Sequence, residues 1–143
     1  MSRPCSVHWA ILDTGIYIGH WEAGQYDALL SEVRRGFVVR HSAVVLSELR
    51  RGAHSPAARQ RVEGLFRLAR IVWEPKSADW WEAGKVVREV GDREGWEVNK
   101  RREFQNDALI GLTARRYGAT VVTSNRADFS LLKSRLNIGV LCP

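Results

Sequence analysis

Short runs rich in apolar and β-branched residues alternate with longer helical patterns along the whole chain, and this alternation restricts the fold more than any other feature. The first run, residues 9–12, is entirely apolar, as is typical of a strand buried on both faces. Further runs that favour strands lie at residues 37–40, 71–73, 120–123 and 138–141. Strands that alternate with helices predict an α/β fold whose central parallel sheet carries helices on both faces.

The segments between these runs have the apolar spacing and the end signals of helices. Helices are predicted at about residues 14–35, 43–51, 56–69, 77–94, 103–117 and 128–133. The chain has 143 residues and contains no linker, low-complexity tract or internal repeat. We therefore predict a single domain over residues 1–143.

Two carboxylates in the first third of the chain lie where apolar residues are expected. Asp13 directly follows the first apolar run, and Glu48 shares a helix face with Val44 and Val45. A helix cap could account for Asp13, and a salt bridge to a nearby arginine could account for Glu48. Alternatively, a carboxylate in such surroundings is stabilised by a cation or takes up a proton.

Asp107 repeats this anomaly in the last third of the chain, because its helical neighbours at positions 104, 110 and 111 are apolar or glycine. An acid early in a helix also suits the helix dipole, which is the simpler explanation. Asn125 and Asp128 leave the fourth predicted strand, where such residues commonly form turns and caps.

The carboxyl ends of parallel strands meet at one edge of the sheet, and this rule brings the acidic segments together. Carboxylates that converge cannot all ionise without a counter-cation, and Mg²⁺ or Mn²⁺ prefers oxygen ligands. Such ions can activate water for phosphodiester cleavage. The formal net charge of +6 also favours a polyanionic partner, of which nucleic acid is the commonest.

Four short motifs, in this order and spacing, resemble the PIN-domain family and within it the VapC-type toxins of toxin–antitoxin pairs. They are residues 11–15 (ILDTG), 45–49 (VLSEL), 106–110 (NDALI) and 123–129 (TSNRADF). The resemblance covers essentially the full chain. It implies a three-layer α/β/α PIN-like fold with a central parallel sheet, and an endoribonuclease that depends on Mg²⁺ or Mn²⁺.

The resemblance also implies roles for particular residues. Asp13 and Asp107 match direct metal ligands, and Glu48 matches a ligand or the group that orients the attacking water. Thr123 matches the hydroxyl residue that precedes the fourth acidic position. That position departs from the family pattern, because Asn125 stands where many members have Asp. Asp128 could supply the missing carboxylate as a metal ligand, so either one or two ions could bind.

Partners and location follow partly from the resemblance, which implies a cognate antitoxin that blocks the site, an RNA substrate and a homodimer. No apolar stretch is long enough to span a bilayer and no signal-peptide pattern is present, so we expect a cytoplasmic protein with no membrane partner. Cys5 and Cys142 are then expected to be free thiols.

Two further features bear on partners. The neighbouring Trp80 and Trp81 cannot both face the core of a helical segment, so one of them can mark a partner surface. A core or protein contact is the more common role for tryptophan, and RNA stacking is the alternative. Residues 100–102 (KRR) are expected to precede the helix of Asp107 and to contact phosphate.

Two other functions compete with the nuclease. The first is a PIN-like module that binds RNA without cutting it, which Asn125 favours. The second is an interaction protein without metal, whose tryptophans form the partner surface. No GxxxxGK or GxGxxG motif is present, which argues against nucleotide binding of those kinds.

Overall fold

The computed structural model describes residues 6–143 and has a five-stranded sheet at its centre. The strand order is β3-β2-β1-β4-β5, and every neighbouring pair is parallel. The strands are β1 (Trp9–Leu12), β2 (Val38–Ser42), β3 (Val72–Trp73), β4 (Ala119–Val122) and β5 (Gly139–Leu141). The predicted parallel sheet is confirmed, and strand boundaries differ from the expected ones by one or two residues.

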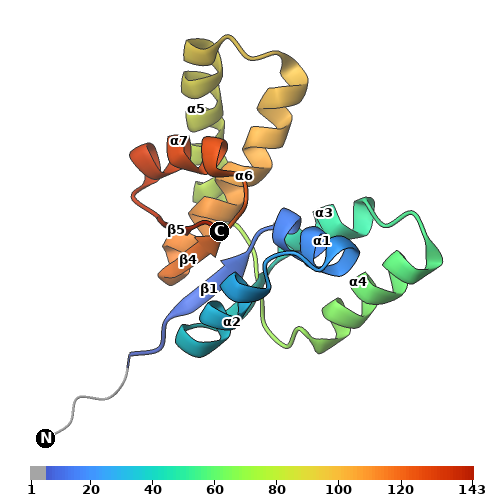
Figure 1. Cartoon of the computed structure of the whole chain (residues 1–143). Coiled ribbons are helices and arrows are strands. Elements are labelled where there is room, and N and C mark those ends of the chain that lie inside the picture. Colours follow the sequence, from blue (N-terminus) through green and yellow to red (C-terminus); the bar gives the residue numbers. More distant parts are fainter. Residues whose placement is uncertain (1–5) are drawn as a thin grey trace, which may run out of the picture.

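Within residues 6–143, seven helices connect and cover these strands, which makes the fold a three-layer α/β/α arrangement as predicted (Figure 1). They are α1 (Thr14–Ala23), α2 (Asp27–Gly36), α3 (Ala43–Arg51), α4 (Pro56–Leu68), α5 (Ser77–Glu94), α6 (Val98–Tyr117) and α7 (Arg126–Leu136). Three side-chain caps fix helix starts in the first half of the chain: Asp13 for α1, Ser42 for α3 and Ser55 for α4.

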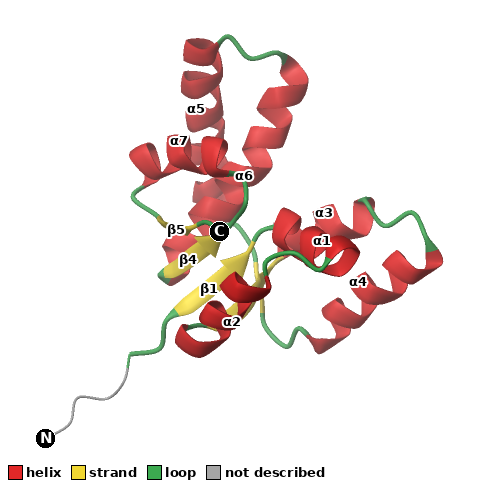
Figure 2. Cartoon of the chain, viewed as in Figure 1, coloured by secondary structure: helices red, strands yellow, loops and turns green. Residues whose placement is uncertain are grey.

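Two pairs of helices form arms on opposite sides of β1 (Figure 2). One arm is the hairpin of α5 and α6, and the other is the pair α3 and α4; the helices of each pair are in contact. The carboxyl end of β1 points to the region where the two arms meet. Side chains that follow β1 therefore lie between the N-terminal and the C-terminal parts of the chain.

The prediction of one continuous helix over residues 14–35 is wrong, because two helices, α1 and α2, occupy this range. Gly24 ends α1 in the left-handed conformation with φ of 61°, and Tyr26 begins α2 with φ of 69°. A left-handed residue cannot continue a right-handed helix, so the chain turns here. The bend separates the helix that carries Asp13 at its start from the helix that packs beside β2.

Helix α6 also differs from its prediction, because it begins at Val98 and not near residue 103. The side chain of Glu97 caps it by accepting a 2.9 Å hydrogen bond from the backbone N–H of Lys100. Residues 100–102 therefore lie inside the first turns of the helix. Lys100 and Asp107 are seven residues apart, which is about two turns, so they lie on the same side of α6.

The core is built on β1, whose Ala10 and Ile11 are fully buried between neighbouring strands and helices. Aromatic residues close one end of the sheet: the ring of Trp73 stacks on Tyr117 at 4.3 Å, and Trp9 meets Trp73 edge-on at 5.9 Å. These tryptophans have structural roles. Trp80 and Trp81, in contrast, are 51% and 86% exposed.

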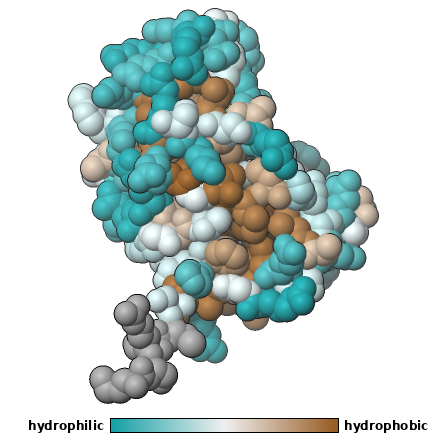
Figure 3. Space-filling model, turned by 60° about the vertical axis from the view of Figure 1, so that its left-hand side comes forward, coloured by the Kyte–Doolittle hydropathy of each residue, from teal (hydrophilic) through white to brown (hydrophobic). Residues whose placement is uncertain are grey.

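The surface view in Figure 3 has a band of hydrophobic residues that crosses one face between hydrophilic regions. A contiguous apolar surface on a folded domain commonly marks a contact with a partner. Within residues 6–143, no helix has the length and apolar character needed to cross a membrane. Cys142 is a free thiol, and Cys5 lies outside the described residues.

Candidate active site

Asp13 and Thr123 lie side by side at the carboxyl edge of the sheet because β1 and β4 are parallel neighbours. Leu12 pairs with Val122 in the register of the two strands, so the residues that follow them meet. The Thr123 hydroxyl donates a 2.7 Å hydrogen bond to Oδ2 of Asp13, and the backbone N–H of Thr14 donates to Oδ1 at 2.8 Å. Burial raises the pKa of Asp13, while these two hydrogen bonds oppose the rise.

Glu48 reaches the same edge from α3. The hydroxyl of Thr14 donates a 2.9 Å hydrogen bond to its Oε1, and the Asn106 amide donates to Oε2 at 3.5 Å. Its hydrogen-bond partners are thus neutral side chains and not the arginines at positions 50 and 51. Burial is the main cause of the raised pKa of Glu48, and the charge of Asp13 adds to it.

Asp107 lies on α6 and has the most strongly perturbed carboxyl group of the site. Its pKa is raised to about 8, first by burial and then by the negative charges of Asp13, Asp128 and Glu48. The charge of Lys100 partly offsets this rise. Four carboxylates from distant parts of the sequence are therefore close enough to repel one another.

Asn125 and Asp128 both reach this cluster from the start of α7. The Asn125 amide donates to Oδ2 of Asp107 at 3.5 Å and to Oδ2 of Asp128 at 3.1 Å. Its own Oδ1 accepts from the backbone N–H of Asp128, so Asn125 also caps the helix. Asn125 therefore has both roles that the sequence suggested: it caps a helix, and it lies beside Asp107 and Asp128.

Lys100 has a different place from the one predicted from the sequence. Its Nζ lies 2.6 Å from Oδ2 of Asp128 and 4.9 Å from the ring centre of Trp96. The ammonium group thus lies at the rim of the acidic cluster, where it balances part of the negative charge. Arg101, its neighbour, faces elsewhere and pairs with Asp92 at 2.8 Å.

Two polar residues of the site escaped sequence reasoning: Thr14 and Asn106. Thr14 and Asn106 are each adjacent to a candidate acid in the sequence, which is the one signal that could have singled them out. Both donate to Glu48 and fix its orientation. The pairing of Lys100 with Asp128, in contrast, depends on the contact between α6 and α7.

The donor chemistry of the cluster fits a divalent cation such as Mg²⁺ or Mn²⁺, because its acids offer only oxygen ligands. The mutual repulsion that raises the pKa of Asp107 is also what a bound cation would relieve. Within residues 6–143, however, no three side chains of His, Cys, Asp or Glu are arranged so that they could hold an ion. Neutral groups donate hydrogen bonds to oxygens of Asp13, Glu48 and Asp107, so binding of an ion by these acids would require side-chain movement.

The sequence also matches a known family. Residues 10–133 match the model of the PIN domain, and this range includes Asp13, Glu48, Asp107 and Asp128. The search of curated proteins gave no significant match.

Solved structures with the same fold come from several bacteria. A chain in "2.2 A resolution structure of VapBC-1 from nontypeable Haemophilus influenzae" matches with a TM-score of 0.68 at 20% identity, over 94% of this chain and 97% of that one. VapBC2 from Rickettsia felis bound to a promoter DNA fragment gives 0.66 at 20% identity, over 94% and 98%. DNA-bound VapBC from Salmonella typhimurium gives 0.66 at 21% identity, over 96% and 98%.

Proposed function

The chain belongs to the PIN-domain family, and from this premise we propose that it is a metal-dependent endoribonuclease that acts as the toxin of a toxin–antitoxin pair. The observation that carries the proposal is the convergence of four carboxylates at one sheet edge. Their mutual repulsion, together with burial, raises the pKa of Asp107 to about 8. Such a cluster is costly to a protein unless a cation is to be bound there.

In this proposal, Asp13, Glu48 and Asp107 hold a Mg²⁺ or Mn²⁺ ion. The bound ion would supply activation of a water molecule and stabilisation of the leaving oxygen. Thr123 fixes the orientation of Asp13, and Thr14 fixes that of Glu48. If Glu48 does not bind the ion directly, it would instead orient the attacking water.

The second part of the site is suited to a phosphate group. The Lys100 ammonium lies at the rim of the cluster with a third of its side chain exposed, so it can approach a phosphate oxygen while keeping Asp128 as its partner. The net charge of +6 supports a polyanionic substrate, for which RNA is our proposal. Asp128 would then join the metal ligands only by giving up its contact with Lys100.

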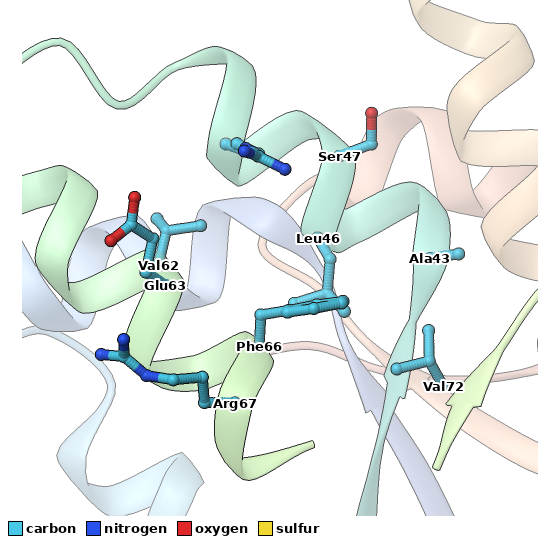
Figure 4. A pocket seen from close by; sticks show the side chains of 9 residues that line it. Ala43, Leu46, Ser47, Val62, Glu63, Phe66, Arg67 and Val72 are labelled. Carbon is cyan, nitrogen blue, oxygen red and sulfur yellow. The ribbon is translucent and has the colours of Figure 1, made fainter. Parts of the chain in front are cut away.

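A protein partner is proposed on separate grounds. The VapBC structures that share this fold are named as pairs, and we infer that this chain also pairs with an antitoxin. A pocket of about 520 Å³ between α3, α4 and β3 is a suitable surface for an apolar segment of that partner. Figure 4 shows Phe66 and Leu46 on its floor and Arg67 at its side, and Phe66 is 61% exposed. We also propose a homodimer, which size-exclusion chromatography with light scattering would test.

The test of the nuclease is cleavage of a labelled structured RNA by the purified protein with Mg²⁺, with Mn²⁺ and with a chelator. An Asp107→Asn protein purified in the same way controls for contaminating nucleases. Cleavage by the parent alone, and only with metal, supports the proposal. Equal cleavage by both proteins assigns the activity to a contaminant and counts against it.

One observation favours a second candidate, a PIN-like module that binds RNA without cutting it. Asn125 places a neutral amide between Asp107 and Asp128, so this position adds no further carboxylate to the cluster. This candidate predicts RNA binding by the parent protein with no cleavage in the presence of either metal. Metal-dependent cleavage that Asp107→Asn abolishes would exclude it.

A further inference from the structure

A second hollow adjoins the acidic cluster and shares Glu48 with it. Its volume is about 330 Å³, and residues of α3, α5 and α6 and of the segment before α5 line it. Small-molecule sites span ~300–1,000 Å³, so this hollow is large enough for one flat ring system. Trp80 lies on one side, and Glu48 and Asn106, which belong to the acidic cluster, lie on another. The hollow therefore opens directly beside the proposed chemistry.

Trp80 keeps about half of its surface exposed in this hollow, although a large aromatic side chain is usually covered. Its position is fixed by its neighbour Asp79, which is buried and accepts two 2.9 Å hydrogen bonds from the Arg116 guanidinium. Asp79 also accepts from the backbone N–H of Lys76, which fixes the first turn of α5. An exposed aromatic ring on a rigid helix start is pre-organised for a planar ligand.

The hollow combines the aromatic ring of Trp80 with a basic side chain and two acidic ones. Arg51, the basic residue, is exposed and comes from α3. Of the two acids, Glu48 belongs to the cluster, and the Glu74 carboxylate lies 3.9 Å from the ammonium group of Lys76. Aromatic side chains that stack on unpaired bases, with basic residues that contact the backbone, are the usual means of binding single-stranded nucleic acid.

We propose that Trp80 stacks on an unpaired base of the RNA next to the cleaved phosphodiester, and that Arg51 contacts the phosphate of that nucleotide. This inference rests on the proposed function, since it concerns the substrate of the same site. Trp81 is the internal comparison. It is more exposed than Trp80 but lines a different surface, together with Lys85, Glu89 and Arg135 of the α5–α7 side.

The experiment measures binding separately from cleavage by using the full-length Asp107→Asn protein. A fluorescein-labelled single-stranded RNA of mixed sequence is the probe, and anisotropy gives its Kd at low salt without divalent metal. Adding Trp80→Ala is expected to raise the Kd about tenfold, since the free energy of stacking a base on an aromatic side chain commonly corresponds to a change in affinity of about that size. Trp80→Phe should recover most of the affinity, and Trp81→Ala should change the Kd less than twofold.

A probe with abasic positions separates stacking from a general effect on the fold. Abasic RNA should bind the proteins with Trp80 and with Trp80→Ala equally, because no base is present to stack. Equal losses for Trp80→Ala and Trp81→Ala, or no loss for either, would overturn the inference. If the parent cuts RNA while Trp80→Ala changes neither Kd nor KM, the inference fails and the nuclease stands. If the parent cuts no RNA with either metal and the Asp107→Asn protein with Trp80 intact binds none, both fail.

Discussion

The hydroxyl of Thr123 donates a 2.7 Å hydrogen bond to Oδ2 of Asp13, although the two residues are 110 positions apart in the sequence. Both side chains are buried, so this bond satisfies a carboxylate oxygen that water does not readily reach. Asp13 directly follows β1 and Thr123 directly follows β4, so the bond joins the ends of two neighbouring strands of the sheet at the proposed metal site.

Replacement of Thr123 tests this bond. Thr123→Val keeps the shape of the side chain but leaves Oδ2 of Asp13 without its donor, and we expect a loss of ~1–3 kcal/mol in the free energy of unfolding. Thr123→Ser keeps the hydroxyl and should lose less. Urea denaturation of the metal-free proteins gives both values, and equal stability of the Val and Ser variants would contradict the role of the hydroxyl.

The raised pKa of Asp107 predicts an unusual pH dependence of stability in the metal-free protein. The folded chain holds a proton on Asp107 up to a pH of about 8, whereas the unfolded chain releases it near the model value of 3.8. Between these values the folded state binds more protons, so stability falls as pH rises, by ~1.4 kcal/mol per pH unit for one such group. The stabilising effect is complete below the unfolded pKa and is lost as pH passes through 8.

The measurement is chemical denaturation from pH 5 to pH 8 with a chelator present. Asp107→Asn should flatten the dependence, and the same change at the exposed Asp27 serves as the control for charge. Asp13 and Glu48, whose pKa values are also raised, contribute in the same direction. Stability of the parent that stays level or increases over this range would contradict a clustered acidic site.

Lys100 is predicted to compete with metal ions for the cluster. Lys100→Met removes the 2.6 Å partner of Asp128 and leaves one more uncompensated negative charge. We expect tighter Mn²⁺ binding by calorimetry, together with a metal-free protein that is less stable by roughly 1–3 kcal/mol. In the double variant with Asp128→Asn, both effects should largely disappear, because the two residues act as a pair. Unchanged Mn²⁺ affinity in Lys100→Met would show that the ammonium lies outside the metal's influence.

Asp79 is predicted to stabilise the α5–α6 arm through Arg116. The guanidinium hydrogen bonds are the main cause of its lowered pKa, so this stabilisation is present above the unfolded pKa near 3.8 and is lost as pH falls further. Asp79→Asn should therefore destabilise the protein at neutral pH, by ~1–3 kcal/mol. Thermal denaturation of the Asp79→Asn protein checks this expectation, with Glu94→Gln, a change at the exposed end of the same helix, as the control. Equal melting temperatures of the two variants would refute it.

Much of the fold was predictable from the sequence because its strands are buried runs without polar alternation. Residues 9–12 read as a buried strand, and the rule for parallel strands then placed Asp13, Glu48 and Asp107 at one edge. The break at Gly24 was missed because the apolar spacing was followed only around residues 29–33. The start of α6 was missed because Glu97 caps it, and Glu is not among the preferred capping residues.

The interior of the site could be predicted only in part. The sequence places acids on apolar helix faces, but it does not predict that neutral side chains donate hydrogen bonds to them. The contacts of Asn106 with Glu48 and of Lys100 with Asp128 join helices that are distant in the sequence. Such contacts depend on how α3, α6 and α7 pack against one another. The spacing of hydrophobic residues predicts the helices but does not determine their packing. The hollow beside Trp80 is missing from the sequence prediction for the same reason.

The strand order places β4 directly beside β1, so the acidic cluster draws its members from both ends of the chain. Synthesis of this sequence produces Asp13 and Glu48 early, Asp107 only after about three-quarters of the 143 residues, and Thr123 and Asp128 only after more than four-fifths. A growing polypeptide on the ribosome therefore cannot assemble this cluster ahead of time. For a protein proposed to destroy RNA, that order of synthesis protects the machinery that produces it until the last helix has folded.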